Sequence, residues 1–364
     1  MSGVGKLLGR FSIGLLVALL VQPAFADDAC RIAYDMGSSG IRAGSSVSPV
    51  TKQVDIDYLA PLWAGQGLEN TFVPTAAALL DLPLKGGFAA ACPHVGGGFS
   101  AWRLALQQDA GALADLLARL HAASEVAVLV IPQNQEGAYG YRGARQLLGE
   151  RLTTSHVLDI GGGSLQVAGE RTTFGEVLGQ KVWHRTLCQE IRNSESSPCL
   201  LQPMTGDELQ SARALLAEKL QGVAAALSEK VTMTAISRPV SRGVLPAVAR
   251  LLPAATDVAG FRRPVLSAAI ERLARMTREE MISALGAGAD THVAYLISDM
   301  LLVEGLMTAT DSDFLQVAEL DLTNLPGLLA DERAFAWEKH YTCYLERLRE
   351  QGLKAYDSDP ETCP

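Results

Sequence analysis

The sequence predicts an α/β fold built from two similar domains that face one another. Three observations lead to this prediction. A strand, a Gly/Ser-rich turn and a second strand occupy residues 31–46, and the same pattern returns over residues 156–169. Between them, residues 126–131 are apolar throughout, as expected for a parallel strand buried on both faces. Strands and helices also alternate along the chain, which is typical of layered α/β domains.

The first domain is expected to open with three strands. Residues 31–35 form a short apolar run before a tight turn, and residues 42–46 continue as the second strand. Residues 53–59 alternate apolar and polar side chains, which predicts a strand with one exposed face.

Two helices and one further strand complete the first domain before residues 126–131. Residues 70–82 carry a helical period, and the small residues 87–92 predict a fourth strand. Residues 100–122 predict one long amphipathic helix. Its apolar face is formed by Leu104, Leu113, Leu116, Leu117 and Leu120.

The second domain begins with the strands 156–160 and 165–169 and is mostly helical afterwards. Further strands are predicted at 231–236 and 314–319, and helices at 206–228, 243–252, 264–276, 277–285 and 289–308. A last helix with alternating charge, 334–351, is expected to pack back on the first domain. The chain is therefore predicted to divide into a targeting segment over residues 1–26, a first domain over 27–150, a second domain over 151–330, and a C-terminal helix and tail over 331–364.

Composition excludes several classes of protein. At about 150 residues per domain, 364 residues fit two domains. The apolar fraction of 48% and the charged fraction of 20% exclude a largely disordered chain. A net charge of −9 without a basic tail argues against nucleic-acid binding, which needs a cationic surface. No repeat of 20–50 residues is present, so a solenoid is excluded.

The first 26 residues have the pattern of a secretory signal peptide. Lys6 and Arg10 precede an apolar run over 11–21, and Ala24 and Ala26 offer the small side chains of an A-x-A cleavage site. The run is short for a membrane span. The prediction is a periplasmic or secreted protein with no stable membrane span after cleavage, and the alternative is an uncleaved anchor.

The chain has six cysteines, all beyond residue 26, and an even number in an exported chain favours disulfides. Cys188 and Cys199 bracket a polar loop and are the favoured pair, although free buried thiols remain the alternative. Cys30 and Cys92 are predicted not to pair, because parallel first and fourth strands would carry them at opposite ends.

Two turns have the composition of phosphate-binding loops. Each follows a strand that ends in an aspartate, Asp35 in the first case and Asp159 in the second. Small residues let backbone N–H groups approach a phosphate, and the carboxylates could hold Mg²⁺ or its waters. A single turn of this kind is weak support, because glycine-rich turns are common. The predicted phosphate-binding residues are Gly37, Ser38, Ser39, Gly40, Gly161, Gly162, Gly163 and Ser164.

A third group of polar residues lies near these turns in the sequence. Glu136 follows the apolar strand 126–131 and could accept a proton from an attacking water, although a glutamate at a helix start is also favoured by the helix dipole. Arg103, Arg42 and Arg142 could neutralise phosphate oxygens, or could be ordinary surface charges.

Other site chemistries are not indicated by the sequence. The six histidines lack the spacing of zinc ligands, and neither CxxC nor HExxH occurs. The serine-hydrolase elbow G-x-S-x-G, the P-loop and the Rossmann fingerprint are also absent from the sequence.

These motifs, in this order, resemble the actin/sugar kinase/Hsp70 superfamily, and within it the Ppx/GppA family of exopolyphosphatases and guanosine pentaphosphate phosphohydrolases. The matching stretches are 34–40, 100–105, 131–144 and 159–164, with a helical tail over 261–329. The resemblance implies two ribonuclease-H-like (actin-like ATPase) domains with the site in the cleft between them, and helical C-terminal additions. It also implies homodimers.

The resemblance implies that the protein hydrolyses terminal phosphoanhydride bonds of polyphosphate or guanosine polyphosphates by Mg²⁺-dependent attack of water. By position, Glu136 matches the general base, Arg103 the phosphate-binding arginine and Asp159 the metal-side carboxylate. Asp35 and Asp159 would hold the Mg²⁺ between them.

Several positions depart from the family pattern. Ser39 stands where asparagine is usual, and Leu165-Gln166 where Thr-Glu is usual. Residues 237–241 replace a Gly-Gly-Thr loop, and Gly288 replaces an arginine. Gln166 and the first turn are similar to apyrases, so a nucleoside tri- and diphosphate hydrolase is the second hypothesis. A catalytically weak binder of polyphosphate or nucleotides is the third.

Overall fold

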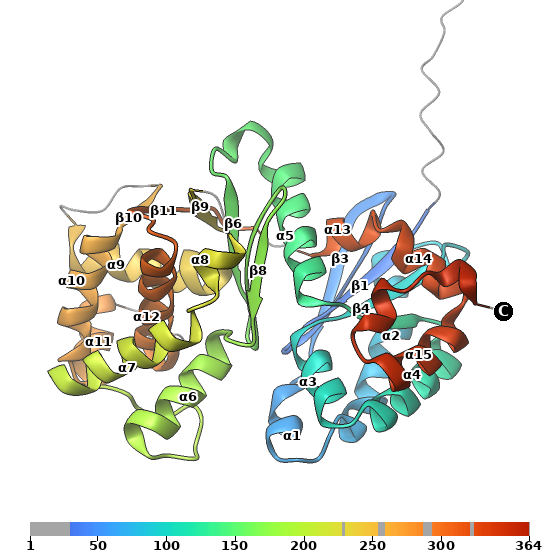
Figure 1. Cartoon of the computed structure of the whole chain (residues 1–364), viewed down its shortest axis with the longest axis horizontal. Coiled ribbons are helices and arrows are strands. Elements are labelled where there is room, and N and C mark those ends of the chain that lie inside the picture. Colours follow the sequence, from blue (N-terminus) through green and yellow to red (C-terminus); the bar gives the residue numbers. More distant parts are fainter. Residues whose placement is uncertain (1–29, 228–229, 254–258, 287–292, 321–323, 364) are drawn as a thin grey trace, which may run out of the picture.

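The computed structural model describes residues 30–227, 230–253, 259–286, 293–320 and 324–363. It contains two β-sheets, each covered by helices, in two halves that lie next to one another (Figure 1). The predicted signal peptide, residues 1–26, lies outside the described residues, as do the first four residues of the predicted helix 289–308.

The first sheet has five strands in the order β3-β2-β1-β4-β5. The strands β1, β2 and β3 form an antiparallel meander, whereas β4 and β5 continue the sheet parallel to β1. Their bounds are β1 Ile32–Met36, β2 Gly40–Ser45, β3 Ser48–Asp55, β4 His94–Gly98 and β5 Ala127–Val130. This arrangement confirms the predicted buried parallel strand, because every residue of β5 is buried.

The second sheet has six strands in the order β10-β11-β9-β6-β7-β8. It repeats the design of the first, with an antiparallel meander at one edge followed by the parallel strands β9 and β11, and it adds β10, which is antiparallel to β11, at the other edge. The bounds are β6 His156–Ile160, β7 Leu165–Gly169, β8 Thr173–Glu176, β9 Met233–Ala235, β10 Gly260–Arg262 and β11 Phe314–Val317. The predicted α/β fold with two similar sheets is therefore confirmed.

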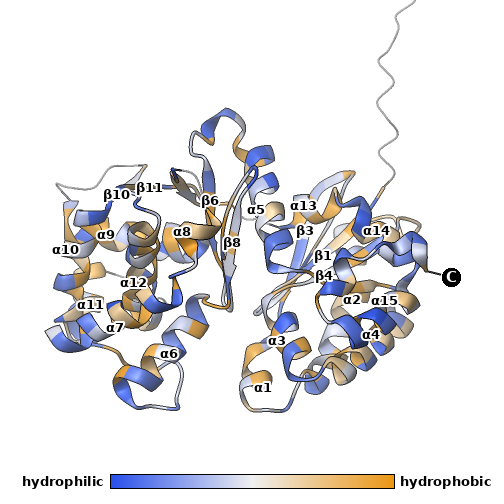
Figure 2. Ribbon diagram, viewed as in Figure 1, coloured by the Kyte–Doolittle hydropathy of each residue, from blue (hydrophilic) through white to orange (hydrophobic). Residues whose placement is uncertain are grey.

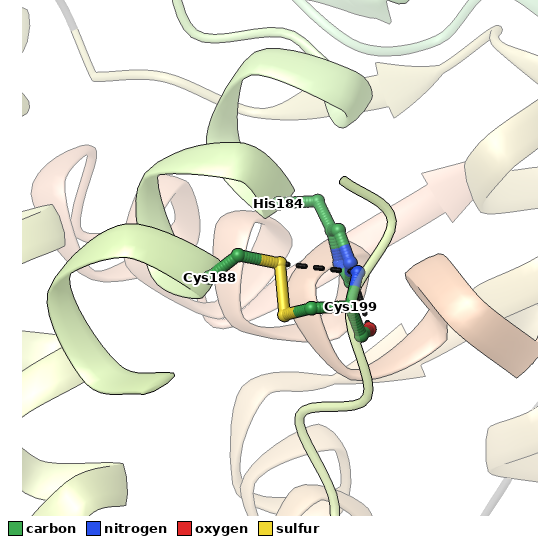
Figure 3. Close-up of side chains that lie close together, drawn as sticks. All are labelled: His184, Cys188 and Cys199. Atoms are coloured by element: carbon green, nitrogen blue, oxygen red, sulfur yellow. Dashed lines mark hydrogen bonds between the residues drawn. A yellow bond between two sulfur atoms is a disulfide. The ribbon is translucent and has the colours of Figure 1, made fainter. Parts of the chain in front are cut away.

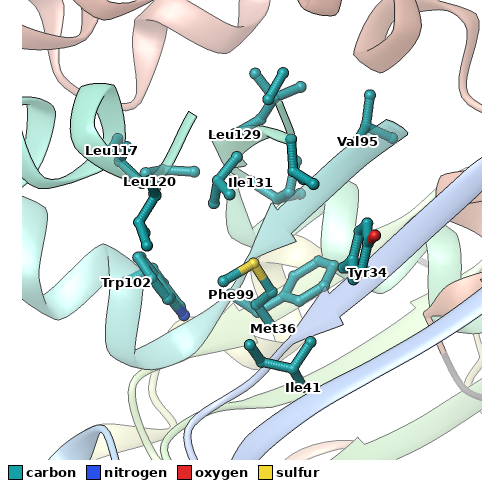
Figure 4. Close-up of a cluster of buried hydrophobic side chains, with 14 of the residues drawn as sticks. Tyr34, Met36, Ile41, Val95, Phe99, Trp102, Leu117, Leu120, Leu129 and Ile131 are labelled. Atoms are coloured by element: carbon teal, nitrogen blue, oxygen red, sulfur yellow. The ribbon is translucent and has the colours of Figure 1, made fainter. Parts of the chain in front are cut away.

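Helices of the first half pack their apolar faces on the first sheet. Trp102, Leu117 and Leu120 lie in one buried cluster with Met36 and Leu129 of the strands (Figure 4). The helices are α1 Leu59–Trp63, α2 Phe72–Gly86, α3 Ser100–Gln108 and α4 Ala110–Ser124, preceded by the short 3₁₀ turn η1 Glu69–Thr71. These contacts remove large apolar side chains from water, which is the main force that holds the half together.

Helices of the second half enclose α12, Val293–Ala309, whose residues are buried on nearly all sides (Figure 2). A helix that is apolar all round belongs in the interior of a domain. The surrounding elements are α6 Gln180–Arg192, α7 Gly206–Lys219, α8 Val223–Ala226, the π-helical turn η3 Pro239–Val244, α9 Leu245–Leu251, α10 Arg263–Ala274 and α11 Arg278–Leu285.

Helix α5, Gln133–Leu148, joins the two halves. It follows β5 of the first sheet and then packs on β7 and β8 of the second (Figure 1). The short helix α13, Leu325–Leu329, packs on the other side of α5 and on β1. A 3₁₀ turn, η2 Gly149–Arg151, ends the connection to β6. Any residue at the start of α5 is thereby held between the two sheets.

The C-terminal segment returns to the first half, as the sequence predicts. Tyr341 donates its hydroxyl hydrogen to the carbonyl of Val128, and the hydroxyl of Tyr344 accepts from the amide of Val130. The segment forms α14 Glu332–Lys339, α15 Tyr341–Gln351, α16 Lys354–Asp357 and the turn η6 Pro360–Thr362. Its side chains share one buried cluster with the first sheet.

Asp331 connects this segment to α5. Its Oδ2 accepts hydrogen bonds from the hydroxyls of Tyr139 and Tyr356 and from Nε2 of Gln135, the last over 3.2 Å. Its Oδ1 accepts from the backbone of Arg333 and so caps α14. One carboxylate therefore ties the C-terminal helices to the helix that joins the two halves.

Some element boundaries differ from the prediction. Residues 87–92 form a loop, and the fourth strand lies further on, at β4. The single helix predicted over 100–122 is two helices, because Asp109 ends α3 with an extended backbone and caps α4 through the amide of Ala112. The helix predicted over 334–351 is likewise divided at His340.

Three disulfides join the six cysteines. Cys188 pairs with Cys199 as predicted, and Cys343 pairs with Cys363. The prediction that Cys30 and Cys92 do not pair is wrong. Because Ile32 pairs with His94 in parallel strands, Cys30 and Cys92 each lie two residues before the start of their strand, at the same end of the sheet. The error comes from placing the fourth strand too early.

Within the described residues, none of the helices combines the length and the apolar character needed to cross a lipid bilayer.

Candidate active site

A cavity of about 420 Å³ lies where the two halves meet. Its walls come from both sheets, from the start of α5 and from the start of α6. The predicted residues on its walls are Asp35, Gly37, Ser38, Ser39, Gly40, Glu136, Asp159, Gly161, Gly162 and Ser164. The structure thus brings both predicted turns and the predicted base to one place.

The two aspartates occupy equivalent positions in the two sheets. Asp35 is the fourth residue of the five-residue strand β1 and pairs with Arg42 on β2. Asp159 is the fourth residue of the five-residue strand β6 and pairs with Gln166 on β7. Each carboxylate therefore lies one residue before the end of its strand, next to the turn.

The second turn rests on the start of α6. The amides of Gln180 and Lys181 donate to the carbonyls of Gly161 and Gly162 over 2.9 and 2.8 Å. Gly179 makes this approach possible, because a Cβ on it would lie 2.4 Å from the amide nitrogen of Ser164. The loop is fixed by these contacts and by its own hydrogen bond from the amide of Gly161 to the carbonyl of Ser164, over 2.9 Å.

The two turns touch one another across the cavity. A Cβ on Gly162 would lie 2.5 Å from Oγ of Ser38 and 3.4 Å from Oγ of Ser39. A Cβ on Gly163, which is not among the cavity-lining residues, would lie 2.2 Å from Oγ of Ser100 at the start of α3. Serine side chains of the first half therefore occupy the space where a side chain on either glycine would lie, and a larger residue would require those serines to move.

Glu136 lies in the first turn of α5, with 6% of its surface exposed. Its Oε2 accepts hydrogen bonds from Nη2 of Arg103 over 2.6 Å and from Nε2 of Gln166 over 2.9 Å. These two donors use both lone pairs of Oε2. Among the described residues no donor reaches Oε1, so this oxygen remains for a group in the cavity.

The hydroxyl of Ser164 is fixed by the same two donors. Its Oγ accepts from Nη2 of Arg103 over 3.1 Å and from Nε2 of Gln166 over 3.2 Å. With both lone pairs engaged, the hydroxyl hydrogen must be donated elsewhere. Since Ser164 lines the cavity, this hydrogen is available to an acceptor there.

Arg103 lies behind the wall of the cavity. Its side chain is 2% exposed, and it donates to the carbonyl of Ile131 as well as to Glu136 and Ser164. It is not among the cavity-lining residues. In this structure Arg103 holds the carboxylate of Glu136 in place, a role that the sequence did not indicate.

The positive charges on the cavity wall come from other residues. Arg42 lines the cavity as expected, and its guanidinium donates to Oε1 of Gln53 over 2.6 Å. Lys181 and Arg238 also line it, and the sequence analysis missed both. Arg142 does not line the cavity and donates instead to the carbonyl of Ala330. Only the tertiary fold brings Lys181 and Arg238 to this place.

The oxygen atoms near Asp35 suit a divalent cation. Burial, together with the nearby charge of Glu136, raises the pKa of Asp35 to about 7, against the opposing effects of Arg42 and Asn324. Oδ1 of Asn324, on the same wall, is buried without a hydrogen-bond partner in the described part of the chain. Carboxylate and amide oxygens are the ligands that Mg²⁺ prefers. Asp35, Asp159 and Asn324 therefore fit Mg²⁺, and Asn324 was not predicted.

A second cluster, formed by His184, Cys188 and Cys199, resembles a metal site only in composition (Figure 3). The two sulfur atoms are bonded to one another, so neither is a thiolate ligand. Both ring nitrogens of His184 already have partners, Oγ of Ser298 and the carbonyl of Cys199. Burial lowers the pKa of His184 to about 4, which keeps the ring neutral.

A family profile and several solved structures of similar fold match this chain. The profile of the Ppx/GppA phosphatase family matches residues 103–320. The type II variant of the Aquifex aeolicus Ppx/GppA phosphatase superposes with a TM-score of 0.57 at 17% identity, covering 82% of this chain and 98% of that chain. An exopolyphosphatase from Cytophaga hutchinsonii superposes with a TM-score of 0.55 at 15% identity, covering 82% of this chain and 96% of that chain. At these identities the likeness shows the fold. No curated protein matches the sequence.

Proposed function

Because the chain belongs to the Ppx/GppA phosphatase family, we propose that it hydrolyses the terminal phosphoanhydride bond of polyphosphate or of guanosine polyphosphates, with Mg²⁺ and water. One observation carries the proposal. Two Gly/Ser turns, each preceded by a strand-end aspartate, meet at the cavity wall that also holds the carboxylate of Glu136. The solved structures of similar fold include an exopolyphosphatase, which supports the substrate class.

The two turns would hold the last phosphates of the substrate. Backbone amides of both turns and the hydroxyls of Ser38, Ser39 and Ser164 supply hydrogen-bond donors at the cavity wall. The side chains of Arg42 and Lys181 add positive charge there. Phosphoryl transfer needs mainly positioning and charge neutralisation, which such a cradle provides.

Glu136 would activate the attacking water. Its Oε1 is the carboxylate oxygen without a protein donor in the described residues, so it can accept a hydrogen bond from a water beside the terminal phosphate. The water oxygen forms a bond to phosphorus while the anhydride P–O bond breaks. The proton of the water passes to Oε1, and the leaving phosphate carries away the electron pair of the broken bond.

Asp35, Asp159 and the amide oxygen of Asn324 would hold a Mg²⁺ ion. A bound cation supplies charge neutralisation for the phosphate oxygens. It also compensates the carboxylate of Asp35, whose charge burial disfavours. Arg103 acts on the reaction through Glu136, as a positioning residue, because in this structure it contacts the base and lies behind the cavity wall.

We also propose that the protein is exported, to the periplasm or outside the cell, after removal of residues 1–26. The three disulfides support this location, because disulfides persist in oxidising compartments. The site then serves to release phosphate from substrates outside the cytoplasm.

The test is a phosphate-release assay on the purified, disulfide-bonded protein with Mg²⁺. Long-chain polyphosphate, guanosine pentaphosphate, ATP and GDP are compared, with Glu136→Gln as the control for contaminating phosphatases. Release from polyphosphate or guanosine pentaphosphate that the control lacks supports the proposal. Release from ATP and GDP alone would replace it with a nucleotide hydrolase. Tight binding of polyphosphate without any turnover would replace it with a binding protein.

A further inference from the structure

The side chain of Gln180 connects the cavity to a buried carboxyl group. Gln180 lines the cavity at the start of α6, and its Nε2 donates to Oδ2 of Asp299 on α12 over 2.5 Å. Asp299 is only 3% exposed, and its Oδ1 has no hydrogen-bond partner in the described part of the chain. Burying a carboxyl group with one oxygen unpaired costs free energy of folding, so its presence here calls for a functional explanation.

We propose that Gln180 is a further phosphate-contacting residue, and that Asp299 determines which face of the Gln180 amide is presented to the phosphate. The inference rests on the proposed function, because it assigns Gln180 to the same phosphate-binding cavity. It adds a residue pair, on α6 and α12, that neither the motifs nor the two turns include.

The protonation state of Asp299 determines which end of the Gln180 amide faces it. When Asp299 is ionised it can only accept, so Gln180 must turn an N–H toward it and keeps its own carbonyl oxygen for the other side. When Asp299 is protonated it can donate to that carbonyl oxygen, which frees both amide hydrogens. Rotation of the amide about its terminal bond is sufficient for the exchange, and no backbone movement is needed. A phosphate, which accepts hydrogen bonds, is bound better in the second state.

The surroundings of Asp299 place this exchange in an accessible pH range. Burial raises the pKa of Asp299 to about 8, and the hydrogen bond from Gln180 opposes the shift only in part. The other titratable groups nearby are the neutral His184 of α6, Tyr295 one turn earlier on α12, and Asp57, whose charge also raises the pKa of Tyr295. Further along α12, Glu304 is paired with Arg213.

The expected consequence is that phosphate binding weakens as the pH rises through about 8. Two effects act in the same direction. The amide loses a donor toward the phosphate, and a negative charge appears behind the loop that contains Gly161. A change of about tenfold in KM is expected, which corresponds to one charge-assisted hydrogen bond.

The experiment measures KM and kcat from pH 6 to pH 9.5 for the full-length mature protein and three variants. In Asp299→Asn the amide that replaces the carboxyl can donate to the carbonyl of Gln180 at every pH, as the protonated acid does. KM is expected to stay low at high pH, with kcat unchanged. In Gln180→Leu, KM is expected to be high at every pH. Ser298→Ala, which changes a neighbouring buried group bonded to His184 and Tyr295, is expected to keep the wild-type profile.

The ratio of variant to wild-type KM at each pH removes effects that all forms share, including ionisation of the substrate and of Asp35. Identical pH profiles for Asp299→Asn and wild type would overturn the inference. An unchanged KM in Gln180→Leu would do the same.

A binding measurement separates this inference from the proposed function. Titration calorimetry with methylenediphosphonate, which has no cleavable anhydride, gives the affinity without catalysis. If the protein hydrolyses no substrate but binds this probe more weakly above pH 8, and Asp299→Asn removes the change, the inference holds while the proposed function fails. If the protein binds the probe at no pH, Gln180 is not a phosphate-contacting residue.

Discussion

Arg103 and Glu136 form an ion pair at the wall of the cavity, with Nη2 2.6 Å from Oε2; Glu136 lines the cavity and Arg103 lies behind it. The pair joins α3 of the first half to the first turn of α5. Arg103 also donates to the carbonyl of Ile131 and to Oγ of Ser164. These two contacts fix the guanidinium, which in turn fixes the carboxylate of Glu136. Oε2 of Glu136 is thus committed to protein donors, whereas Oε1 has no donor among the described residues.

Replacing Glu136 by glutamine is expected to lower kcat by about 10²–10⁴-fold, the contribution typical of a general base. The fold should be retained, because an amide of the same shape takes the place of the carboxylate. Phosphate release and circular dichroism measure the two effects. Activity equal to wild type would exclude Glu136 from the role.

Replacing Gln166 by glutamate places a second carboxyl group within hydrogen-bond distance of Oε2 of Glu136. Two carboxylates this close cannot both be ionised at neutral pH. The acid limb of the pH profile of kcat/KM should therefore move to higher pH. Gln166→Leu is the matched control, since it removes the donor without adding charge. An acid limb that moves equally in both variants would contradict the explanation.

Replacing Gly162 by alanine is expected to raise KM by about tenfold or more, because the new Cβ would lie 2.5 Å from Oγ of Ser38 and would displace this hydroxyl from its place on the cavity wall. A displacement of this size impairs positioning even when the chemistry is unchanged. Gly206→Ala serves as the control, because nothing lies within 4 Å of a Cβ there. If both variants show the wild-type KM, the two turns do not bind the phosphates together.

Asp299 should also affect stability in a pH-dependent way. Its pKa is about 8 in the folded protein and near 3.8 when unfolded, so the folded state binds the proton more tightly. Stability is therefore lost as the pH rises from about 4 to 8, by at most about 6 kcal/mol at 1.4 kcal/mol per pKa unit. Asp299→Asn removes this loss. Urea unfolding should show that the free energy of unfolding of Asp299→Asn, relative to wild type, is higher at pH 9 than at pH 5. The same difference between variant and wild type at both pH values would refute this.

Asp331 is expected to be important for stability. Asp331→Ala removes the cap of α14 and the shared acceptor of the Tyr139 and Tyr356 hydroxyls, which can then bond only to one another, so one buried hydroxyl hydrogen is left without an acceptor. A loss of about 2–4 kcal/mol in the free energy of unfolding is expected. Asp115→Ala, which removes only the exposed ion pair to Arg349, should cost less than about 1 kcal/mol. Similar losses in both variants would show that the buried network carries little energy.

Local sequence patterns predicted the parts of the fold that depend on neighbouring residues. The strands β6 and β7 begin and end where the residues on either side of the turn Gly161–Ser164 indicated, since a hairpin is specified by its own residues. The strand β4 was misplaced, because three of its five residues are the glycines Gly96, Gly97 and Gly98, which carry no hydrophobic signal. That one shift also produced the wrong conclusion about Cys30 and Cys92.

The candidate site was predicted where its residues lie in motifs and missed where only the fold assembles it. The two turns, both aspartates and Glu136 follow strands and could be recognised from the sequence. Asn324 reaches the cavity from a distant segment that has no motif of its own, and Arg238 comes from residues 237–241, which the sequence marked only as a departure from the family pattern. The position of Arg103 behind Glu136 depends on the crossing of α3 and α5, which no periodicity encodes.

The return of the C-terminal helices to the first sheet has a consequence for the order of assembly. The buried cluster of the first half includes Trp337, Tyr344 and Tyr356, whereas that of the second half draws on residues between Leu158 and Leu315 alone. During synthesis or threading through a translocation channel, the half that emerges first therefore lacks part of its interior until the last helices follow. The half that emerges later is the one able to mature first, and the wall of the cavity between the halves is complete only once Asn324, which follows both sheets in the sequence, has emerged.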